Sequence, residues 1–390
     1  MAATTFPGKT APNGRNPASQ GGGTQVNVES QGMTQDAATG LMVPFSRATK
    51  LRIDSGRTLT GTMAAATAQL TFSPLPTTGY LACIYMEVIL TTAGNAAAVA
   101  FNADAPWNFF RQIQFKTPDG TPLMNSLTGY QAFLAAKWGA YRLGRPEGSA
   151  LAFSTTAGAG ATGGSFTLVL PIYTEFERDC IGLLANMDAS AAYQLDLTIG
   201  VTADLYSTAP TNPGTYVINL YLESYSNPPN EVNGQPAKTE PQALGSTQFW
   251  TVQNYSWSGT GEQTFILNRT GNLLRTLVLV FRTAAGARSA TVFPSGNLRI
   301  ELDQMVLQNE NILLNQFKVY RYATYDLDTG VYLIPYTFDP DDVLTAPYGD
   351  AFLPTYTQTK YAIIFTPGVA GSLEVLENDV APSGDIYAIG

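Results

Sequence analysis

Histidine is absent from all 390 residues of this chain. Its absence excludes Ser-His-Asp triads, Cys-His nucleophile pairs, His-ligated zinc and acid–base catalysis by imidazole. Carboxylates remain as catalytic candidates, but a glycosidase-like mechanism needs two of them facing each other across a cleft. The composition therefore argues against most classes of enzyme.

Charged residues are scarce as well, at 13% of the chain, and the formal net charge is −9. Nucleic-acid binding depends mainly on Lys and Arg, so we expect no direct contact with a genome. The low charge leaves much of the surface uncharged, which suits a protein covered by copies of itself. The abundance of Gly, Thr, Ala and aromatic residues is typical of strand-rich sandwiches with many turns.

Cysteine occurs twice, at Cys83 in an apolar strand and at Cys180 in an acidic loop. We expect two buried free thiols rather than a disulfide. No secretory signal is visible at the start, and the longest apolar run, Leu277 to Phe281, is too short to span a bilayer. The Asn-x-Ser/Thr matches at Asn254 and Asn268 are then chance, and we expect a soluble chain made without export.

A long internal repeat organises the sequence. Residues Phe166 to Ile199 and Val331 to Phe365 each begin with an apolar strand in which proline precedes an aromatic side chain or an Ile-aromatic pair. Each copy continues through an acidic loop into a second strand. Upstream, Tyr80 to Gly94 and Leu273 to Gly286 are apolar strands that end in Thr-Ala-Gly or Thr-Ala-Ala-Gly. A repeat of this length indicates two similar domains rather than a solenoid.

The domain boundaries follow from this repeat and from composition. We predict an N-terminal arm over 1–44, a first sandwich over 45–228, a linker over 229–244 and a second sandwich over 245–390. The arm is rich in Gly, Thr, Asn and Pro and has too few apolar groups for a core of its own. A neighbouring subunit is the simplest structure to hold it.

Each half shows about eight strands of period two, together with one short helix. The first helix is predicted near Tyr130 to Trp138, with one apolar face lying across the end of the first sandwich. The second is predicted near Ile312, Phe317 and Tyr320. A hairpin is expected from Phe249 to Leu267. The linkers at 144–164 and 202–215 are expected to be long exposed loops.

Arg47, Lys50, Arg52 and Arg57 form the densest basic cluster, relieved only by Asp54. It could face anionic lipid head groups, to which each charge contributes about 1 kcal/mol. The alternative, which we favour, is a solvated or salt-bridged strand edge. We expect no cofactor and no metal.

Three kinds of acidic or phosphate-loop-like motif are candidate sites. Two carboxylate groups follow the repeated strand, and their equivalent positions favour a structural role such as helix capping over a glycosidase pair. The segment from Asp326 to Gly330 lacks the later Glu of a calcium loop and is predicted to be a turn. Gly8-Lys9-Thr10 lacks the first glycine of a phosphate loop. The carboxylates concerned are Glu175, Glu177 and Asp179 in the first copy and Asp339, Asp341 and Asp342 in the second.

The stretch from Leu170-Pro171-Ile172-Tyr173 through Leu184-Ala185-Asn186 to Leu197 resembles the double jelly-roll major capsid proteins of tectiviruses and related membrane-containing viruses. In that family a strand ending in proline and an aromatic residue, an acidic segment, a Leu-Ala-Asn turn and an alternating strand occupy this place. The resemblance in architecture extends over about 45–390. It implies an all-β chain of two tandem eight-stranded jelly rolls with short helices between strands and an extended N-terminal arm.

The resemblance also implies a structural role without enzymatic activity. Such proteins form homotrimers in which six jelly rolls make a near-hexagonal capsomer, and the capsomers tile an icosahedral shell over an internal membrane. Its implied partners are neighbouring capsomers through terminal arms, penton and minor capsid proteins, and the internal viral membrane, with no direct nucleic-acid contact. The implied location is the virion of a bacteriophage or similar virus, after synthesis in the host cytoplasm.

Two other functions stay open at this stage. A two-domain β-sandwich could bind carbohydrate, as a viral spike or lectin-like module does, through exposed aromatics and paired carboxylates. A glycosidase built on jelly rolls is the third hypothesis, and it depends on Glu175 or Asp341.

Overall fold

The computed structural model describes residues 35–36, 40–64, 66–92, 95–139, 154–160, 163–177, 180–212, 214–268, 271–303, 305–323, 327–337, 352–355 and 360–381. Most of the N-terminal arm, and the acidic residues Asp179, Asp326, Asp339, Asp341 and Asp342, lie outside them. The described chain divides into two compact units. One contains the described residues up to Lys50 together with Ser226–Gln242, and the other contains Leu51–Tyr225 and the described residues from Ala243 onward.

The smaller unit is built from short pieces. A two-stranded pair, β1 (Gln35–Asp36) with β2 (Gly40–Leu41), is followed by the single-turn helix α2 (Phe45–Ala48). Another pair is β16 (Glu231–Val232) with β17 (Gln235–Pro236). The backbone of Val43 joins the pieces, since its N–H donates to Pro236 at 2.8 Å and its carbonyl accepts from Lys238 at 2.9 Å.

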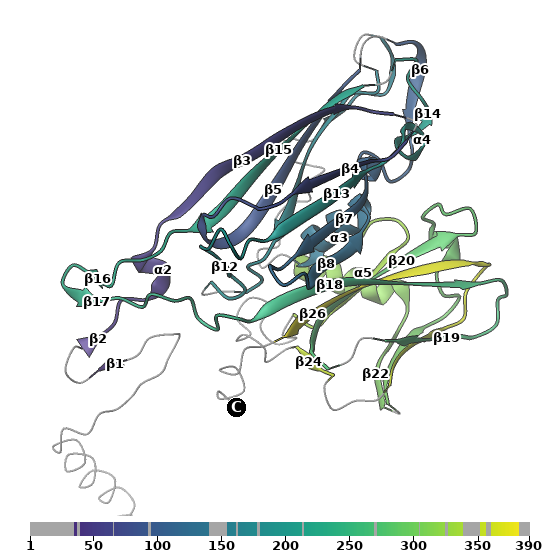
Figure 1. Ribbon diagram of the computed structural model, residues 1–390. Coiled ribbons are helices and arrows are strands. Elements are labelled where there is room, and N and C mark those ends of the chain that lie inside the picture. Colours follow the sequence, from purple (N-terminus) through teal and green to yellow (C-terminus); the bar gives the residue numbers. More distant parts are fainter. Residues whose placement is uncertain are drawn as a thin grey trace, which may run out of the picture. The chain divides into compact units, whose positions relative to one another are not determined.

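The larger unit contains two β-sandwiches with the same strand arrangement (Figure 1). In the first sandwich, one layer has the order β3-β15-β5-β11 and the other has the order β8-β7-β13-β4. The first layer consists of β3 (Leu51–Thr62), β15 (Thr215–Tyr225), β5 (Gly79–Thr91) and β11 (Phe166–Tyr173), and the second of β8 (Pro122–Leu127), β7 (Phe110–Lys116), β13 (Gln194–Ile199) and β4 (Ala68–Phe72).

The second sandwich repeats both layers as β18-β26-β20-β23 and β22-β21-β25-β19. The prediction of about eight strands in each half is therefore confirmed. The strands of the first layer are β18 (Thr247–Trp257), β26 (Gly371–Ala381), β20 (Leu273–Thr283) and β23 (Val331–Pro335), and those of the second are β22 (Met305–Glu310), β21 (Leu298–Leu302), β25 (Tyr361–Phe365) and β19 (Gln263–Leu267).

Shorter elements decorate the two sandwiches. Helix α3 (Gly129–Gly139) follows β8, and α5 (Ile312–Ala323) follows β22 at the equivalent place. A small sheet of order β10-β6-β14 lies beside the first sandwich. The remaining elements are β6 (Asn95–Phe101), η1 (Trp107–Phe109), β9 (Ser154–Thr155), β10 (Gly158–Gly160), β12 (Leu184–Asn186), α4 (Thr202–Leu205), β14 (Tyr206–Thr208), η3 (Ala290–Val292) and β24 (Leu353–Pro354).

Alternation along the strands creates a separate core inside each sandwich. In β15, Tyr216, Ile218, Leu220 and Leu222 are buried, while the intervening residues are half-buried on the outer face. In the first core the ring of Phe109 packs edge-on against Phe110, Phe166 and Tyr216. In the second core Phe365 packs edge-on against Phe281 and Trp257. Each such aromatic pair contributes about 1 kcal/mol beyond its buried area.

Several local predictions were wrong. The segment Phe249 to Leu267 is not a hairpin, because β18 pairs with β26 and β8 while β19 pairs with β25 in the opposite layer. Leu184–Asn186 is a short strand on β5 rather than a turn. The connection at 202–215 forms α4 and β14 instead of a plain loop. In each case a pairing partner distant in the sequence decides the conformation.

Candidate functional site: the junction between the sandwiches

The two sandwiches meet along one continuous sheet. Strand β18 of the second sandwich pairs in parallel with β8 of the first, through Trp250 and Met124. This contact merges a layer from each sandwich into a nine-stranded sheet (Figure 1). The two sandwiches are thus joined by a shared sheet within one compact unit.

Helix α3 fills the space beside this bridge. Its first turn is fixed by a capping box, in which Thr128 Oγ1 accepts from the Gln131 backbone at 3.2 Å and Gln131 Oε1 accepts from the Thr128 backbone at 2.9 Å. All eleven of its residues are buried, whereas the sequence predicted one apolar face at the end of the first sandwich. The reason is that α3 also packs on β20 and β26 of the second sandwich.

Polar side chains on α3 bind partners in the second sandwich. Lys137 Nζ donates to Asp328 at 2.8 Å, and Gln131 Nε2 donates to Glu374 at 3.1 Å. The guanidinium of Arg288 lies 4.3 Å from the centre of the Tyr130 ring. Asp328 belongs to the turn before β23, so the predicted turn at this place is confirmed for its described residues.

Asp104 and Arg282 form the centre of a buried ion network across the same junction. Arg282 Nη1 donates to Asp104 at 2.7 Å and Arg282 Nε donates to Glu374 at 2.5 Å, while Arg288 Nε also donates to Asp104. Burial alone would lower the pKa of Arg282, but the Glu374 and Asp104 carboxylates outweigh it and raise that pKa. The guanidinium therefore stays charged inside the junction.

Arg275 holds the other end of the junction. Its side chain is 2% exposed and donates to the Gly139 carbonyl at 2.6 Å, to Asn378 at 3.0 Å and to the Phe176 carbonyl at 2.9 Å. Gly139 and Phe176 belong to the first sandwich, and Arg275 itself lies on β20. Backbone carbonyls at the ends of first-sandwich elements are thus satisfied by a second-sandwich side chain.

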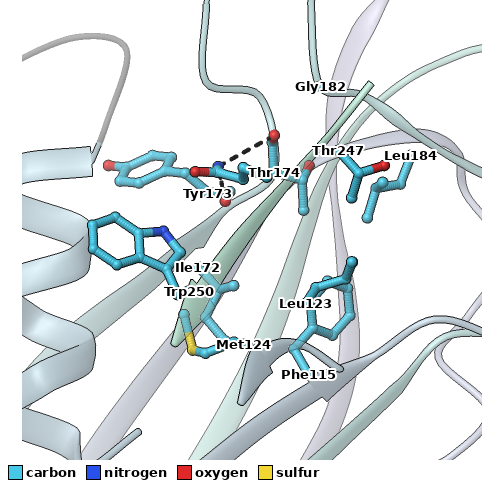
Figure 2. Close-up of a pocket in the computed structure, with 11 residues that line it drawn as sticks. Phe115, Leu123, Met124, Ile172, Tyr173, Thr174, Gly182, Leu184, Thr247 and Trp250 are labelled. Atoms are coloured by element: carbon cyan, nitrogen blue, oxygen red, sulfur yellow. Dashed lines mark hydrogen bonds between the residues drawn. The ribbon is translucent and has the colours of Figure 1, made fainter. Parts of the chain in front are cut away.

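A cavity of about 20 Å³ lies between Trp250, Met124 and Thr174 (Figure 2). The dashed lines in Figure 2 mark hydrogen bonds from Gln248 Nε2 to the Tyr173 carbonyl at 2.8 Å and to the Thr174 carbonyl at 3.4 Å. A volume of this size holds about one water molecule, whereas small-molecule sites need about 300 Å³ or more. We interpret this cavity as a packing space of the junction.

The predicted carboxylate groups do not assemble a reaction centre in the described part of the chain. The Glu175 backbone donates to Ala82 at 3.1 Å, and Glu177 forms an isolated bridge with Ile181. The described residues contain no helix that either carboxylate caps, and no group of three or more Cys, Asp or Glu that could hold a metal. Cys83 and Cys180 are buried and form no disulfide, as predicted, and burial next to Glu223 raises the pKa of Cys83.

The four basic cluster residues fall in both compact units. Arg47 and Lys50 belong to the smaller unit and are exposed. Arg52 and Arg57 lie on β3, where Arg52 Nε contacts Asp54 Oδ2 at 3.0 Å. This exposed ion pair fits the strand-edge interpretation at Arg52. Among the described residues, no helix is long and apolar enough to cross a membrane.

The sequence did not single out the exposed apolar side chains on α5, β22 and β3. On α5, Leu313 is 72% and Phe317 64% exposed. Met305 on β22 and Ile53 on β3 are 59% and 60% exposed. Large exposed apolar patches on soluble proteins commonly mark interaction surfaces, and an apolar helix pattern alone does not tell which face stays open.

Comparisons with known proteins identify the architecture. No protein-family model and no curated protein matches the sequence. Among solved structures, the STIV major capsid protein has a TM-score of 0.61 at 10% identity, covering 87% of this chain and 98% of that one. The Faustovirus major capsid protein has a TM-score of 0.56 at 11% identity, covering 86% and 90%.

The major capsid protein P2 from bacteriophage PM2 has a TM-score of 0.51 at 7% identity, covering 86% of this chain and 98% of that one. All three are double jelly-roll proteins. This chain has a double jelly-roll fold. The resemblance inferred from Leu170 to Leu197 is thus confirmed at the level of the fold, and the similar structures come from several kinds of virus rather than from tectiviruses in particular.

Proposed function

We propose that this chain is a major capsid protein that tiles a viral shell. The observation that carries the proposal is the construction of the double jelly roll, in which two equivalent sandwiches are locked into one body by the Asp104–Arg282 network and the β8–β18 bridge. Proteins of this fold among the solved structures are capsid components. A catalytic role receives no support from the carboxylates that the structure describes.

The proposal includes assembly of three chains into a capsomer. Two similar sandwiches per chain give a trimer six similar edges, which suits a near-hexagonal tile. We expect the purified chain to be a trimer at micromolar concentration, measured by native mass spectrometry and light scattering. A monomer under these conditions would count strongly against the capsid function, and electron micrographs of the source particle should show a faceted shell.

The further partners are part of the same proposal. They are neighbouring capsomers reached through the N-terminal arm, penton and minor capsid proteins, and an internal viral membrane, in a tectivirus-like or related bacteriophage virion. Synthesis in the host cytoplasm belongs to it as well. The domain limits 1–44, 45–228, 229–244 and 245–390 likewise stay a prediction. Carbohydrate binding, the other hypothesis, has no specific observation in its favour.

The basic cluster offers a test of membrane contact. If Arg47, Lys50, Arg52 and Arg57 face lipid, replacing all four with Gln should remove about 1 kcal/mol of vesicle binding per charge near the surface. Cosedimentation with phosphatidylserine vesicles at 0.15 M salt measures this loss. A matched control replaces Lys116, Lys238, Arg299 and Lys360 with Gln. Equal binding by the two variants would assign the cluster to a solvated strand edge.

A further inference from the structure

The two helices of the repeat differ in one respect, which is the covering of their outer faces. Helix α3 is buried along its whole length, because it packs on β11 and β7 of the first sandwich and on β20 and β26 of the second. Helix α5 packs on β23 at the equivalent place, but Leu313, Leu314, Phe317 and Tyr320 are 72%, 45%, 64% and 55% exposed. These four side chains are called the helix surface below. An apolar face of this kind is normally covered.

The N-caps align the two helices residue by residue. Thr128 caps α3 by accepting from the Gln131 backbone, and Asn311 caps α5 by accepting from the Leu314 backbone at 2.9 Å. Gln131 and Leu314 therefore hold equivalent positions. One residue earlier in each helix, Tyr130 of α3 and Leu313 of α5 are equivalent as well. The exposed face of α5 therefore corresponds to the face of α3 that contacts the second sandwich.

Strand register identifies what would cover α5. Pro171 pairs with Tyr85 in the first sandwich, and Pro335 pairs with Thr276 in the second. Counting along β5 and β20 makes Glu87 equivalent to Val278 and Ile89 equivalent to Val280.

The neighbouring strand extends this correspondence. Asn219 and Val217 pair with Glu87 and Ile89 on β5, just as Leu376 and Glu374 pair with Val278 and Val280 on β20. Glu87, Ile89, Val217 and Asn219 are called the sheet surface below.

The sheet surface lies open where its counterpart is covered. Val278, Val280 and Leu376 are all 0% exposed because α3 and its surroundings cover them. Glu87, Ile89, Val217 and Asn219 are all half-buried on the outer face of β5 and β15. The first sandwich thus leaves open the sheet face whose equivalent in the second sandwich is covered by helix α3.

At one pair of equivalent positions, two polar residues are replaced by two apolar residues. In the junction within the chain, Gln131 donates to Glu374 at 3.1 Å. The equivalent positions are Leu314 on the helix surface and Val217 on the sheet surface, so a polar pair is replaced by an apolar pair. Both members change together, as expected if they meet.

The edge strands, and the charges near the two surfaces, fit a contact between the helix surface and the sheet surface. The edge strands β22 and β3 are the equivalents of β8 and β18, which join the sandwiches within the chain. Met305 and Ile53 on these two edges are 59% and 60% exposed. The last turn of α5 carries Arg321, which forms no ion pair with any described residue, and the sheet surface carries Glu87. Arg321, next to the helix surface, and Glu87, on the sheet surface, are therefore opposite in charge.

We infer that the helix surface of one copy docks on the sheet surface of a second copy, reproducing between chains the contact that α3 makes within the chain. The interface is head to tail, and such interfaces generate closed rings when the rotation closes. It rests on the proposed capsomer, for which it names the contacting side chains. Leu314 of one copy then contacts Val217 of the next copy, because Val217 is the equivalent of Glu374.

A charge swap tests this pairing in the full chain. Leu314→Asp and Val217→Lys should each weaken self-association about 30-fold or more, as hot-spot changes do. Asp in the first turn of α5 is compatible with the helix dipole. The double variant should recover association to within about tenfold of wild type, because each interface then pairs Asp with Lys. Light scattering over a dilution series measures all four proteins.

Ile266→Asp serves as the matched control, since Ile266 is 48% exposed on β19, at the opposite edge of the sheet from β22. It should leave association unchanged. A trimer that persists in both single variants would overturn this contact and leave the proposed function standing. A wild-type chain that stays monomeric would overturn both.

Cross-linking gives a second measurement that does not depend on weakened variants. With Phe317→Cys and Ile89→Cys in one chain, a bis-maleimide should link copies covalently, whereas neither single cysteine variant should form linked trimers. Cys83 and Cys180 are buried and should react slowly. Absence of linked copies in a wild-type-like trimer would overturn the proposed pairing.

Discussion

Replacing Arg282 with methionine is expected to lower the free energy of unfolding by about 3 kcal/mol. Arg282 is the only described side chain that binds both Asp104 and Glu374, whose side chains are 10% and 17% exposed. Methionine keeps much of the side-chain length but leaves Glu374 without its cation in a poorly solvated place. Arg288 still binds Asp104, so the loss arises mainly at Glu374. Urea unfolding followed by tryptophan fluorescence measures the change.

Arg299→Met is the control for this prediction. Arg299 also binds a carboxylate, Glu301 at 2.7 Å, but its side chain is 36% exposed. Exposed pairs contribute about 1 kcal/mol or less. Equal losses in the two variants would mean that the Asp104–Arg282 network does not hold the sandwiches together. A double variant Arg282→Met, Glu374→Leu should regain part of the lost stability, because it removes the unpaired carboxylate.

The repeat, the strand content and the position of the helices were predictable because their signals are local. Proline before an aromatic residue marks β11 and β23, and period two marks β15. Alternation fixes which side chains face the core of a sandwich. These signals predicted two sandwiches of about eight strands each, and the resemblance carried by Leu170 to Leu197 implied the double jelly roll.

The junction was not predictable for the opposite reason. Asp104 and Arg282 are 178 residues apart, and neither lies in a pattern that distinguishes it from a surface charge. The parallel bridge between Trp250 and Met124 likewise has no local signature. The sequence predicts one apolar face for α3 because periodicity reports the residues that pack on the first sandwich. It does not report the face that packs on the second sandwich.

The same limit explains why the helix surface went unnoticed. The apolar spacing of Phe317 and Tyr320 predicts a helix, and only their exposure shows that these side chains point outward. The comparison of α3 with α5 is what gives this exposure a meaning. A duplicated fold supplies an internal reference, because one copy shows how a surface looks when it is covered.

Alkaline pH is expected to destabilise the protein steeply because several tyrosines are buried. Burial raises the pKa of Tyr336 to about 12, and it raises the pKa values of Tyr130, Tyr332 and Tyr361 as well. Negative neighbours add to the effect, namely Asp328 at Tyr130 and Glu310 at Tyr332. The hydroxyls of Tyr336 and Tyr361 lie 2.9 Å apart and share a hydrogen bond.

The direction of the pH effect on the free energy of unfolding follows from proton linkage. A tyrosine whose pKa is higher in the folded state than in the unfolded state favours folding through its neutral form. Its contribution is fully present below the unfolded pKa of about 10 and is lost as the pH rises toward the folded pKa. At pH 11 each of the four tyrosines should cost about 1.4 kcal/mol, or about 5.6 kcal/mol together.

Urea unfolding at pH 7, 9, 10 and 11 tests this expectation. The free energy of unfolding should be nearly constant up to pH 9 and then fall. In the folded state at pH 11, wild type and Tyr332→Phe should show the same tyrosinate absorbance at 295 nm, because the buried Tyr332 stays neutral. Tyr332→Phe should reduce the slope above pH 10 by about 1.4 kcal/mol per pH unit, because one buried phenol no longer titrates. A lower tyrosinate absorbance in folded Tyr332→Phe than in folded wild type at pH 11 would show that the Tyr332 hydroxyl ionises in the native state, and the packing described around it in the second sandwich would then be wrong.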